Sequence, residues 1–146
     1  MVADLREIVW AIDPDSDRAS DVVSRMRDVA ANLLRDVRVT FDVQAADTSG
    51  GIGMEVRRHL LLIYKEILHN IAKHAEATEV NIQLQVRRGS IELTVADNGV
   101  GFSPNGSRAG TGLKSLSERA VHLGGDLHLD SAPGRGTTVR FRLRRT

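Results

Sequence analysis

Apolar residues recur at helical spacing in three parts of the chain. Between residues 18 and 35 they fall every three or four positions, as in a helix with one apolar face. These residues are Val22, Val23, Met26, Val29, Ala30, Leu33 and Leu34. Residues 54–75 are predicted to form the longest helix, and residues 113–123 a further helix that ends at Gly124-Gly125.

Strict alternation of apolar and polar residues predicts strands elsewhere. Residues 37–43 alternate so that every second side chain shares one face, which is the pattern of a half-buried strand. The apolar face consists of Val37, Val39, Phe41 and Val43. Residues 80–86 and 91–96 alternate in the same way on either side of a short turn, which predicts a hairpin. Two further strands are expected at 126–131 and 137–144.

The order of these elements favours helices layered on one face of a mixed sheet. We therefore expect an α/β (α+β) two-layer sandwich, in which a mixed, mostly antiparallel sheet is backed by three helices. The basic segment 140–145 alternates arginine with apolar residues. We expect it to lie in an outer strand with Val139, Phe141 and Leu143 inward and the arginines in solvent, rather than to bind nucleic acid.

The composition is that of an ordinary globular domain. The chain has 146 residues, of which 41% are hydrophobic and 27% charged, and this is enough for one well-packed core. A net charge of +1 and an aromatic content of 3% argue against binding to nucleic acid or membranes through charge and stacking. There is no cysteine, which excludes disulfides and thiol catalysis, and no apolar run of 18 or more residues.

A polar stripe on the longest predicted helix lies beside its apolar stripe. With Glu66 at zero, α-helical geometry places Asn70 at about +40°, Lys73 at about −20° and His74 at about +80°. The apolar stripe consists of Leu60, Ile63, Ile67 and Ile71. Two interpretations are open. The stripe is either a solvated face with helix-stabilising contacts, or a cleft wall on which the Asn70 carbonyl ligates Mg²⁺ and Lys73 meets phosphates.

A second group of candidates follows the strand at 91–96. Asp97 ends this strand, and its carboxylate could accept a hydrogen bond from the exocyclic amine of adenine. Gly99 and Gly101, followed by Phe102, would let the backbone approach a base or ribose closely. The alternative is a tight Asn-Gly turn that the aspartate caps. The segment therefore predicts either a turn or a purine-binding loop.

A third segment, Gly110-Thr111-Gly112-Leu113, leads into the helix predicted at 113–123. Free N–H groups and the helix dipole favour phosphate at such a helix start, although two glycines before a helix are often only a loop. We expect residues 98–112 to be loop. The sequence contains no P-loop motif, which excludes that class of nucleotide site.

Taken together, these motifs resemble the ATP-binding superfamily of DNA gyrase, a heat-shock chaperone, histidine kinases and mismatch-repair ATPases. The matching motifs are Glu66-x-x-x-Asn70 with Lys73-His74-Ala75, Asp97-x-Gly99-x-Gly101, Gly110-Thr111-Gly112-Leu113 and Gly134-Arg135-Gly136-Thr137. The resemblance covers roughly residues 18–145 and implies a Bergerat-type ATP-binding fold. The sequences KHA and GLKSLSERA are similar to catalytic domains of bacterial sensor histidine kinases that pair with LuxR/NarL-type response regulators.

The resemblance also implies a role for each motif. Asn70 would ligate Mg²⁺, Asp97 would bind adenine, and Thr137 would support Asp97. The residues that would contact ATP are Asn70, Lys73, His74, Asp97, Gly99, Gly101, Phe102, Gly110, Thr111, Gly112, Leu113 and Thr137. Glu66 would either orient or deprotonate an incoming histidine, or serve as a general base for water as in the ATP-hydrolysing relatives. Residues 102–112 would form a lid over the nucleotide.

The resemblance divides the chain near residue 14. Residues 1–14, which include LREIVWAIDP, resemble the tail of the dimerisation and phosphoacceptor helices, and residues 15–146 the catalytic ATP-binding domain. The chain has five histidines, at positions 59, 69, 74, 122 and 128, and none lies in the N-terminal segment. We therefore expect a protein histidine kinase domain that lacks its phosphoacceptor histidine and does not autophosphorylate in isolation.

The implied partners follow from the same resemblance. They are ATP and ADP, the protein's own dimerisation and phosphoacceptor domain, and a LuxR/NarL-type response regulator downstream. The full-length protein would be a homodimer, with this domain in the cytoplasm and an inner-membrane anchor conceivable for the parent. No nucleic acid partner is expected.

Three alternatives stay open at the level of sequence: an anti-sigma-factor-type serine kinase, an ATP-hydrolysing clamp of the same fold, and a nucleotide sensor without transfer chemistry. A zinc site is not expected, because His69 and His74 would point about 140° apart on one helix. The apolar patch around Trp10 is either a helix-end packing surface or a contact with the acceptor helices.

Overall fold

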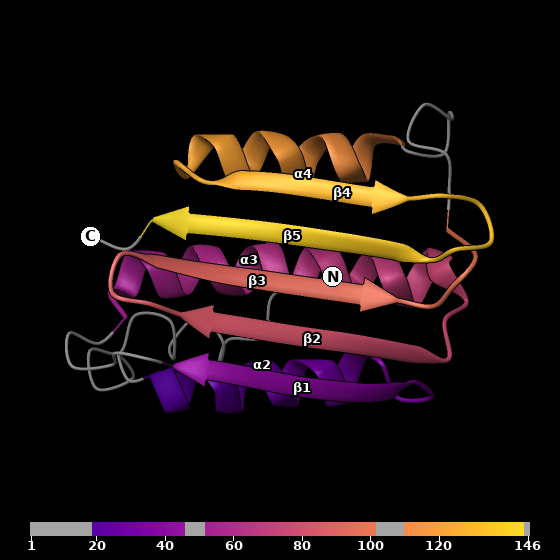
Figure 1. Cartoon of the computed structure of the whole chain (residues 1–146), viewed down its shortest axis with the longest axis horizontal. Helices are drawn as coiled ribbons and strands as arrows, with labels where there is room; N and C mark the ends of the chain where they lie inside the picture. The colour runs from indigo at the N-terminus through magenta and orange to yellow at the C-terminus, as the bar shows by residue number, and fades with distance from the viewer. Residues whose placement is uncertain (1–18, 46–51, 102–109, 145–146) are drawn as a thin grey trace.

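The computed structural model describes residues 19–45, 52–101 and 110–144. Helices, strands and one π-helical turn alternate along the chain (Figure 1). In chain order they are α2 (Ala19–Leu33), β1 (Arg38–Ala45), α3 (Met54–Asn70), η2 (Ile71–Ala75), β2 (Glu79–Val86), β3 (Ser90–Asp97), α4 (Gly110–His122), β4 (Asp126–Ser131) and β5 (Thr137–Arg144). The strands predicted from alternation are all present, with bounds that differ by at most a few residues.

The strands form one five-stranded sheet in the order β1-β2-β3-β5-β4. Strand β1 pairs in parallel with β2, and the other three pairings are antiparallel. The β1–β2 connection contains α3, which is the crossover that a parallel pair requires. The prediction of a mixed, mostly antiparallel sheet is therefore confirmed.

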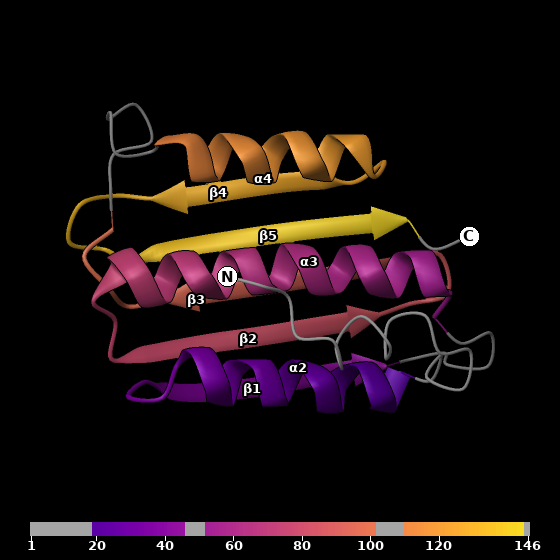
Figure 2. The same cartoon turned by 180° about the vertical axis from the view of Figure 1, so that it is seen from behind.

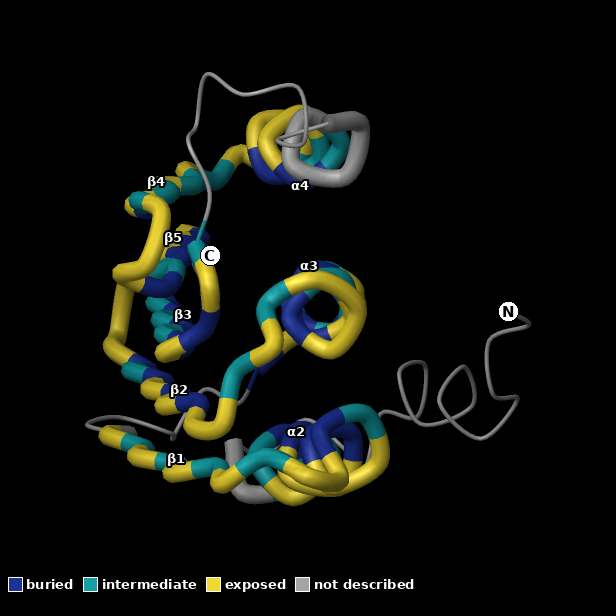
Figure 3. Tube along the Cα trace, turned by 90° about the vertical axis from the view of Figure 1, so that its right-hand side faces the viewer, coloured by how far each residue is buried: buried dark blue, intermediate teal, exposed yellow. Residues whose placement is uncertain are grey.

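The helices α2, α3 and α4 all cover the same face of the sheet, which confirms the two-layer prediction (Figure 3). Every second strand residue points into this interface; the burial of β2 alternates between exposed and buried along its length. The predicted apolar stripe on α3, from Leu60 to Ile71, is buried there. The Tyr64 hydroxyl, itself buried, donates a hydrogen bond to the Met26 carbonyl at 2.7 Å and ties α3 to α2.

The other face of the sheet is polar, and it corrects one prediction. Strand β5 is not an outer strand, because it lies between β3 and β4. Its arginines are exposed because this whole face carries no helix among the described residues, and Arg140 pairs with Glu92 of β3 at 3.6 Å. Alternation of apolar and polar residues indicates only that one face of the sheet is solvated. Central and edge strands of such a sheet alternate equally strictly, so the pattern does not show where in the sheet a strand lies.

Two helix ends also differ from the predictions. The last five residues of the predicted helix 54–75 form the π-helical turn η2, and Glu76 after it adopts left-handed angles with φ 51°. Helix α4 begins at Gly110, so the predicted loop 98–112 is three residues too long at its C-terminal end. A helix can begin at glycine when its first N–H groups need no intrahelical partner.

Several predictions lie outside the described residues. These are the resemblance of residues 1–14 to the tail of the dimerisation and phosphoacceptor helices, the division of the chain near residue 14, Phe102 and most of the predicted lid. Within the described ranges, no helix combines the length and apolar character needed to cross a membrane.

Candidate functional site

The predicted site residues that the structure describes lie toward one end of the molecule. The C-terminal end of α3, the end of β3 and the turn between β4 and β5 lie side by side there (Figures 1 and 2). Hydrogen bonds join the three segments: Val100 N–H donates to the Ala75 carbonyl at 2.8 Å, and Gly134 N–H donates to the Val100 carbonyl at 2.6 Å. Residues that are 25 and 34 positions apart in the sequence thus meet at one corner of the fold.

Asp97 is the buried carboxyl of this corner. It is the last residue of β3, and only 9% of its surface is exposed. Gly99 N–H donates to Asp97 Oδ1 at 2.8 Å. Burial raises the pKa of Asp97, and backbone hydrogen bonds from Gly99 and Thr137 oppose this rise without cancelling it. The carboxylate can therefore accept further hydrogen bonds, while its burial disfavours the charged form. A hydrogen bond from an incoming N–H donor would stabilise that charged form.

The glycines next to Asp97 are required by close contacts between protein segments. A Cβ on Gly99 would lie 2.1 Å from the Ala75 carbonyl oxygen. Gly101 and Gly136 have positive φ angles, and a Cβ on them would lie 2.1 Å from the carbonyl oxygens of Ala132 and Asp97, respectively. The close approach of a base or ribose to Gly99 and Gly101, expected from the sequence, stays a prediction. The structure supplies a second reason for them, which is packing of loop against helix end and turn.

Asn98 joins the Asp97 loop to the start of β2, and the sequence motifs gave it no role. Its Oδ1 accepts hydrogen bonds from the N–H groups of Thr78 and Glu79, both at 2.9 Å, and its Nδ2 donates to Thr78 Oγ1 at 2.9 Å. Its own N–H donates to the Glu79 carbonyl at 3.2 Å. The Asn-Gly dipeptide suggested only a turn, whereas this carboxamide fixes where β2 begins relative to Asp97.

Thr137 lies opposite Asp97 in the β3–β5 ladder. Its backbone donates to the Asp97 carboxyl, and its hydroxyl lies 2.8 Å from Ser131 Oγ. Ser131 is buried at the end of β4, and its hydroxyl donates to the Gly136 carbonyl at 3.0 Å. Sequence reasoning included Thr137 but missed Ser131, whose only signal was a small polar residue at a strand end.

The polar stripe of α3 is only partly preserved. Glu66 and Asn70 are half-buried and stay one α-helical turn apart. Lys73 and His74 lie in η2 and are exposed. The wider π turn rotates them away from the directions that α-helical angles predict, and π turns occur often at functional sites. Partial burial therefore distinguishes Asn70 from Lys73 and His74, which are exposed.

The second glycine motif lies at the start of α4. The first turn of α4 consists of Gly110, Thr111, Gly112 and Leu113. These residues therefore supply the backbone N–H groups that have no intrahelical partner at a helix N-terminus. A helix therefore does begin at this motif, and its contact with phosphate stays a prediction. This helix start disagrees with the assignment of Gly110 and Gly112 to a loop.

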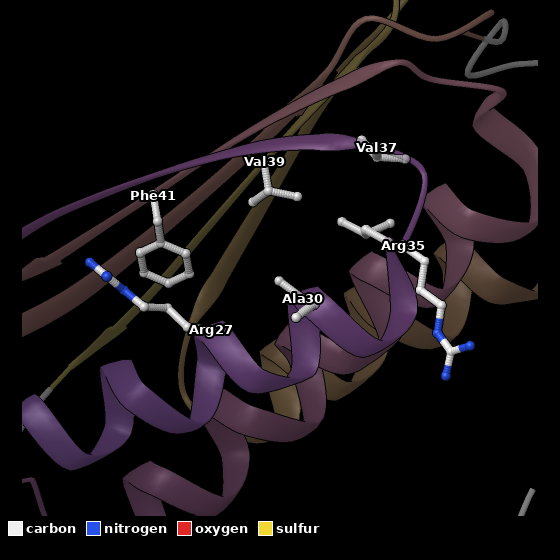
Figure 4. A pocket seen from close by; sticks show the side chains of 8 residues that line it. Arg27, Ala30, Arg35, Val37, Val39 and Phe41 are labelled. Carbon is white, nitrogen blue, oxygen red and sulfur yellow. The ribbon is translucent and has the colours of Figure 1, made fainter.

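A shallow hollow of about 510 Å³ lies elsewhere, between α2 and β1 (Figure 4). Its lining consists of Arg27, Ala30, Ala31, Leu34, Arg35, Val37, Val39 and Phe41. The Arg27 guanidinium stacks over the Phe41 ring at 5.4 Å. The lining holds no carboxylate or carboxamide and none of the predicted site residues, so the corner around Asp97 remains the better candidate for purine recognition.

The described residues contain no cluster of three or more histidine, cysteine, aspartate or glutamate side chains that could hold a metal ion. Among the five histidines, His69 and His74 are both exposed. Asn70 can supply one oxygen to Mg²⁺, an ion that is commonly held by one or two protein ligands together with substrate phosphates and waters. With Asn70 as the one protein ligand named, the site fits an Mg²⁺ ion that binds together with a phosphorylated ligand.

The chain resembles known proteins in both sequence and structure. The sequence profile of the histidine kinase-, DNA gyrase B-, and HSP90-like ATPase family matches residues 55–146. The sensor histidine kinase LiaS of Bacillus subtilis is 32% identical over 108 residues, which cover 73% of this chain and 29% of that protein. The sensor protein VraS of Staphylococcus saprophyticus is 27% identical over 142 residues, which cover 95% of this chain and 40% of that protein. The chain thus spans well under half the length of these relatives.

Solved structures agree on the fold. The histidine kinase AdeS of Acinetobacter baumannii superposes with a TM-score of 0.66 at 16% identity, covering 88% of this chain and 66% of that chain. The mycobacterial sensor histidine kinase MprB superposes with a TM-score of 0.58 at 22% identity, covering 88% of this chain and 95% of that chain. At these identities the likeness establishes the fold, and the residues of the site have to carry any further argument.

Proposed function

Because the chain belongs to the histidine kinase-, DNA gyrase B-, and HSP90-like ATPase family, as the ATP-binding catalytic domain of a sensor histidine kinase, we propose that it transfers the γ-phosphoryl group of ATP to a histidine on a separate dimerisation domain. The observation that carries this proposal is the position of Asp97. It is a buried carboxyl at a strand end, braced by the backbone of Gly99 and Thr137, beside the helix that carries Asn70.

Asp97 would select adenine. A carboxylate accepts hydrogen bonds and does not donate them, so it matches the exocyclic amine of adenine and repels the carbonyl oxygen that guanine has at that place. The bracing by Gly99, Thr137 and Ser131 holds the carboxyl before the base arrives. A preorganised acceptor of this kind gives selectivity, because the wrong base leaves a buried polar group without its partner.

Asn70 would hold Mg²⁺ through its carboxamide oxygen. The ion, when bound with ATP, would neutralise charge on the phosphates. Lys73 and the N-terminal turn of α4 would add positive potential nearby, the first as a side-chain charge and the second through free N–H groups. Phosphoryl transfer needs mainly such positioning and charge stabilisation, so no nucleophile of this chain is required.

The wider signalling role follows from the relatives and is part of the proposal. LiaS and VraS are sensor proteins, and both are longer than this chain. By analogy, the phosphorylated histidine would pass its phosphoryl group to a response regulator of the LuxR/NarL type. The kinase would act as a homodimer through its dimerisation domain.

The test is transfer from radiolabelled ATP to a separately supplied dimerisation and phosphoacceptor domain. We expect Mg²⁺-dependent labelling that is acid-labile and alkali-stable, as a phosphohistidine is and a phosphoserine is not. Asn70→Asp should lower the transfer rate by about a hundredfold or more, because the carboxylate alters the charge and geometry of the Mg²⁺ ligand. Unchanged transfer by this variant would contradict the role of Asn70, and an acid-stable label would favour a serine kinase.

A further inference from the structure

An ion pair joins the helix of Asn70 to α4. Arg119 Nε lies 3.8 Å from Glu66 Oε2, and the two side chains are 40% and 27% exposed. Glu66 Oε2 itself is shielded from solvent and accepts no hydrogen bond within the described ranges of the chain. The carboxylate is thus held by charge attraction, while the acceptor capacity of this oxygen is not used by the protein.

The location of the pair connects it to the candidate site. Glu66 lies one helical turn before Asn70, on the same side of α3. Arg119 lies between Leu116 and Ala120, which are buried and fix this face of α4 against the core. Helix α4 in turn begins at the glycine motif of Gly110. The contact therefore links the Glu66 carboxylate to α4, the helix that begins at Gly110.

Under the proposed function, a carboxylate one helical turn from Asn70 can act on water as well as on a protein nucleophile. Hydrolysis requires that a water oxygen attack the γ-phosphorus as the bond to the β,γ-bridging oxygen breaks and ADP leaves, while the proton of the water passes to a base. A general base must lie within hydrogen-bond reach of that water. Glu66 Oε2 is shielded from solvent where it faces Arg119, although the Glu66 side chain as a whole is 27% exposed.

On the premise of the proposed function, we infer that Arg119 is a positioning residue that determines specificity: it holds the Glu66 carboxylate toward α4 and so keeps the domain from hydrolysing the ATP that it binds. An ion pair of this exposure contributes little to stability, so its removal should redirect the carboxylate without unfolding the domain. The role belongs to Arg119 through Glu66, and Arg119 need not contact the nucleotide.

The experiment measures ADP release by the chain alone with Mg-ATP. The variant is Arg119→Gln, which keeps most of the side-chain length and removes the charge. We expect its hydrolysis rate to rise about tenfold, and Glu66→Gln in the same chain to abolish the gain, since the released carboxylate is the base. Arg119→Lys should restore the low rate, because it restores a cation near Glu66. If Arg119 had a purely structural role, Arg119→Gln would lower the hydrolysis rate, and this change would be the same with or without Glu66→Gln.

Arg140→Ala is the matched control, because it removes a comparable ion pair with Glu92 on the opposite face of the sheet. Circular dichroism checks that each variant is folded, and Arg119→Ala provides a second neutral variant. Calorimetric ATP binding is measured for every chain. An unchanged or reduced hydrolysis rate in both neutral variants, with ATP still bound, overturns the role of Arg119 alone. A gain in hydrolysis that persists in the presence of Glu66→Gln also overturns the role of Arg119. Absence of ATP binding by the unaltered chain would instead overturn the proposed function itself.

Discussion

At the scale of single residues, the chemistry of the candidate site rests on one carboxyl and on the groups that hold it. Asp97 is buried at a strand end, and two backbone N–H donors compensate only part of the cost of burying its charge. Buried polar groups that are not fully compensated are common at functional sites, where a ligand completes their hydrogen bonds. The buried carboxyl thus lowers the stability of the free domain at neutral pH, and it leaves hydrogen-bond acceptor capacity for a ligand.

Replacement of Asp97 by asparagine should separate function from stability. Because burial raises the pKa of Asp97 in the folded state, its contribution to stability is full at low pH and is lost as the pH rises through that raised pKa. At neutral pH the neutral asparagine removes this cost, so the melting temperature of Asp97→Asn should not fall. Its ATP affinity should fall by about a hundredfold, because the amide presents a donor as well as an acceptor to the adenine amine.

Thermal denaturation between pH 4 and 8, together with calorimetric ATP binding, checks this prediction, in the pH range where carboxyl groups with raised pKa values titrate. Asp130→Asn serves as the control, since Asp130 is an exposed carboxyl on β4. ATP affinity close to that of the unaltered chain would rule out Asp97 as the adenine ligand. A melting temperature that drops sharply at neutral pH would show that the carboxylate is held for stability.

At the scale of elements, the site is a junction of a helix end, a loop and a turn. The sequence predicted all the strands and the main helices, because alternation and helical spacing are local signals. It did not predict the π turn after Asn70 or the left-handed Glu76, because these depend on where the Asp97 loop meets the helix. It also placed β5 at the edge of the sheet, since strand order depends on long-range pairing that alternation does not record.

Gly99 is the position at which this junction is tightest, and it provides the prediction at this scale. A Cβ on Gly99 would lie 2.1 Å from the Ala75 carbonyl oxygen, so Gly99→Ala must separate the loop from the helix end. We expect the free energy of unfolding to fall by about 2 kcal/mol or more, which is within the range for overpacking. ATP binding should weaken too, since Asp97 and Asn70 lose their relative placement.

Urea denaturation with Gly89→Ala as the control measures this effect. Gly89 lies in the turn between β2 and β3, and a Cβ there would meet no atom within 4 Å. Its replacement should leave stability within about 1 kcal/mol of the unaltered chain. If both variants lost the same stability, the contact at Ala75 would not be the reason that glycine occupies position 99.

At the scale of the whole molecule, one layer of helices and one sheet bring distant motifs to a single end of the fold. The sequence identified most residues of that end because their motifs resemble a known family, and the family assignment is confirmed. Apart from the support of Asp97 by Thr137, which the resemblance implied, their spatial relations could not be predicted. The bracing of Asp97 through Ser131, the Asn98 contacts with Thr78 and Glu79, and the pairing of Glu66 with Arg119 all join elements far apart in sequence.

The most direct test of the central claim is a calorimetric titration of the folded chain with ATP, with and without Mg²⁺, and with GTP in parallel. The account predicts saturable ATP binding that Mg²⁺ modifies, because Asn70 and the phosphates share the ion, and no comparable binding of GTP, because Asp97 repels the guanine carbonyl. A folded sample that binds neither nucleotide, or binds GTP as well as ATP, would contradict the assignment of this corner as an adenine-nucleotide site.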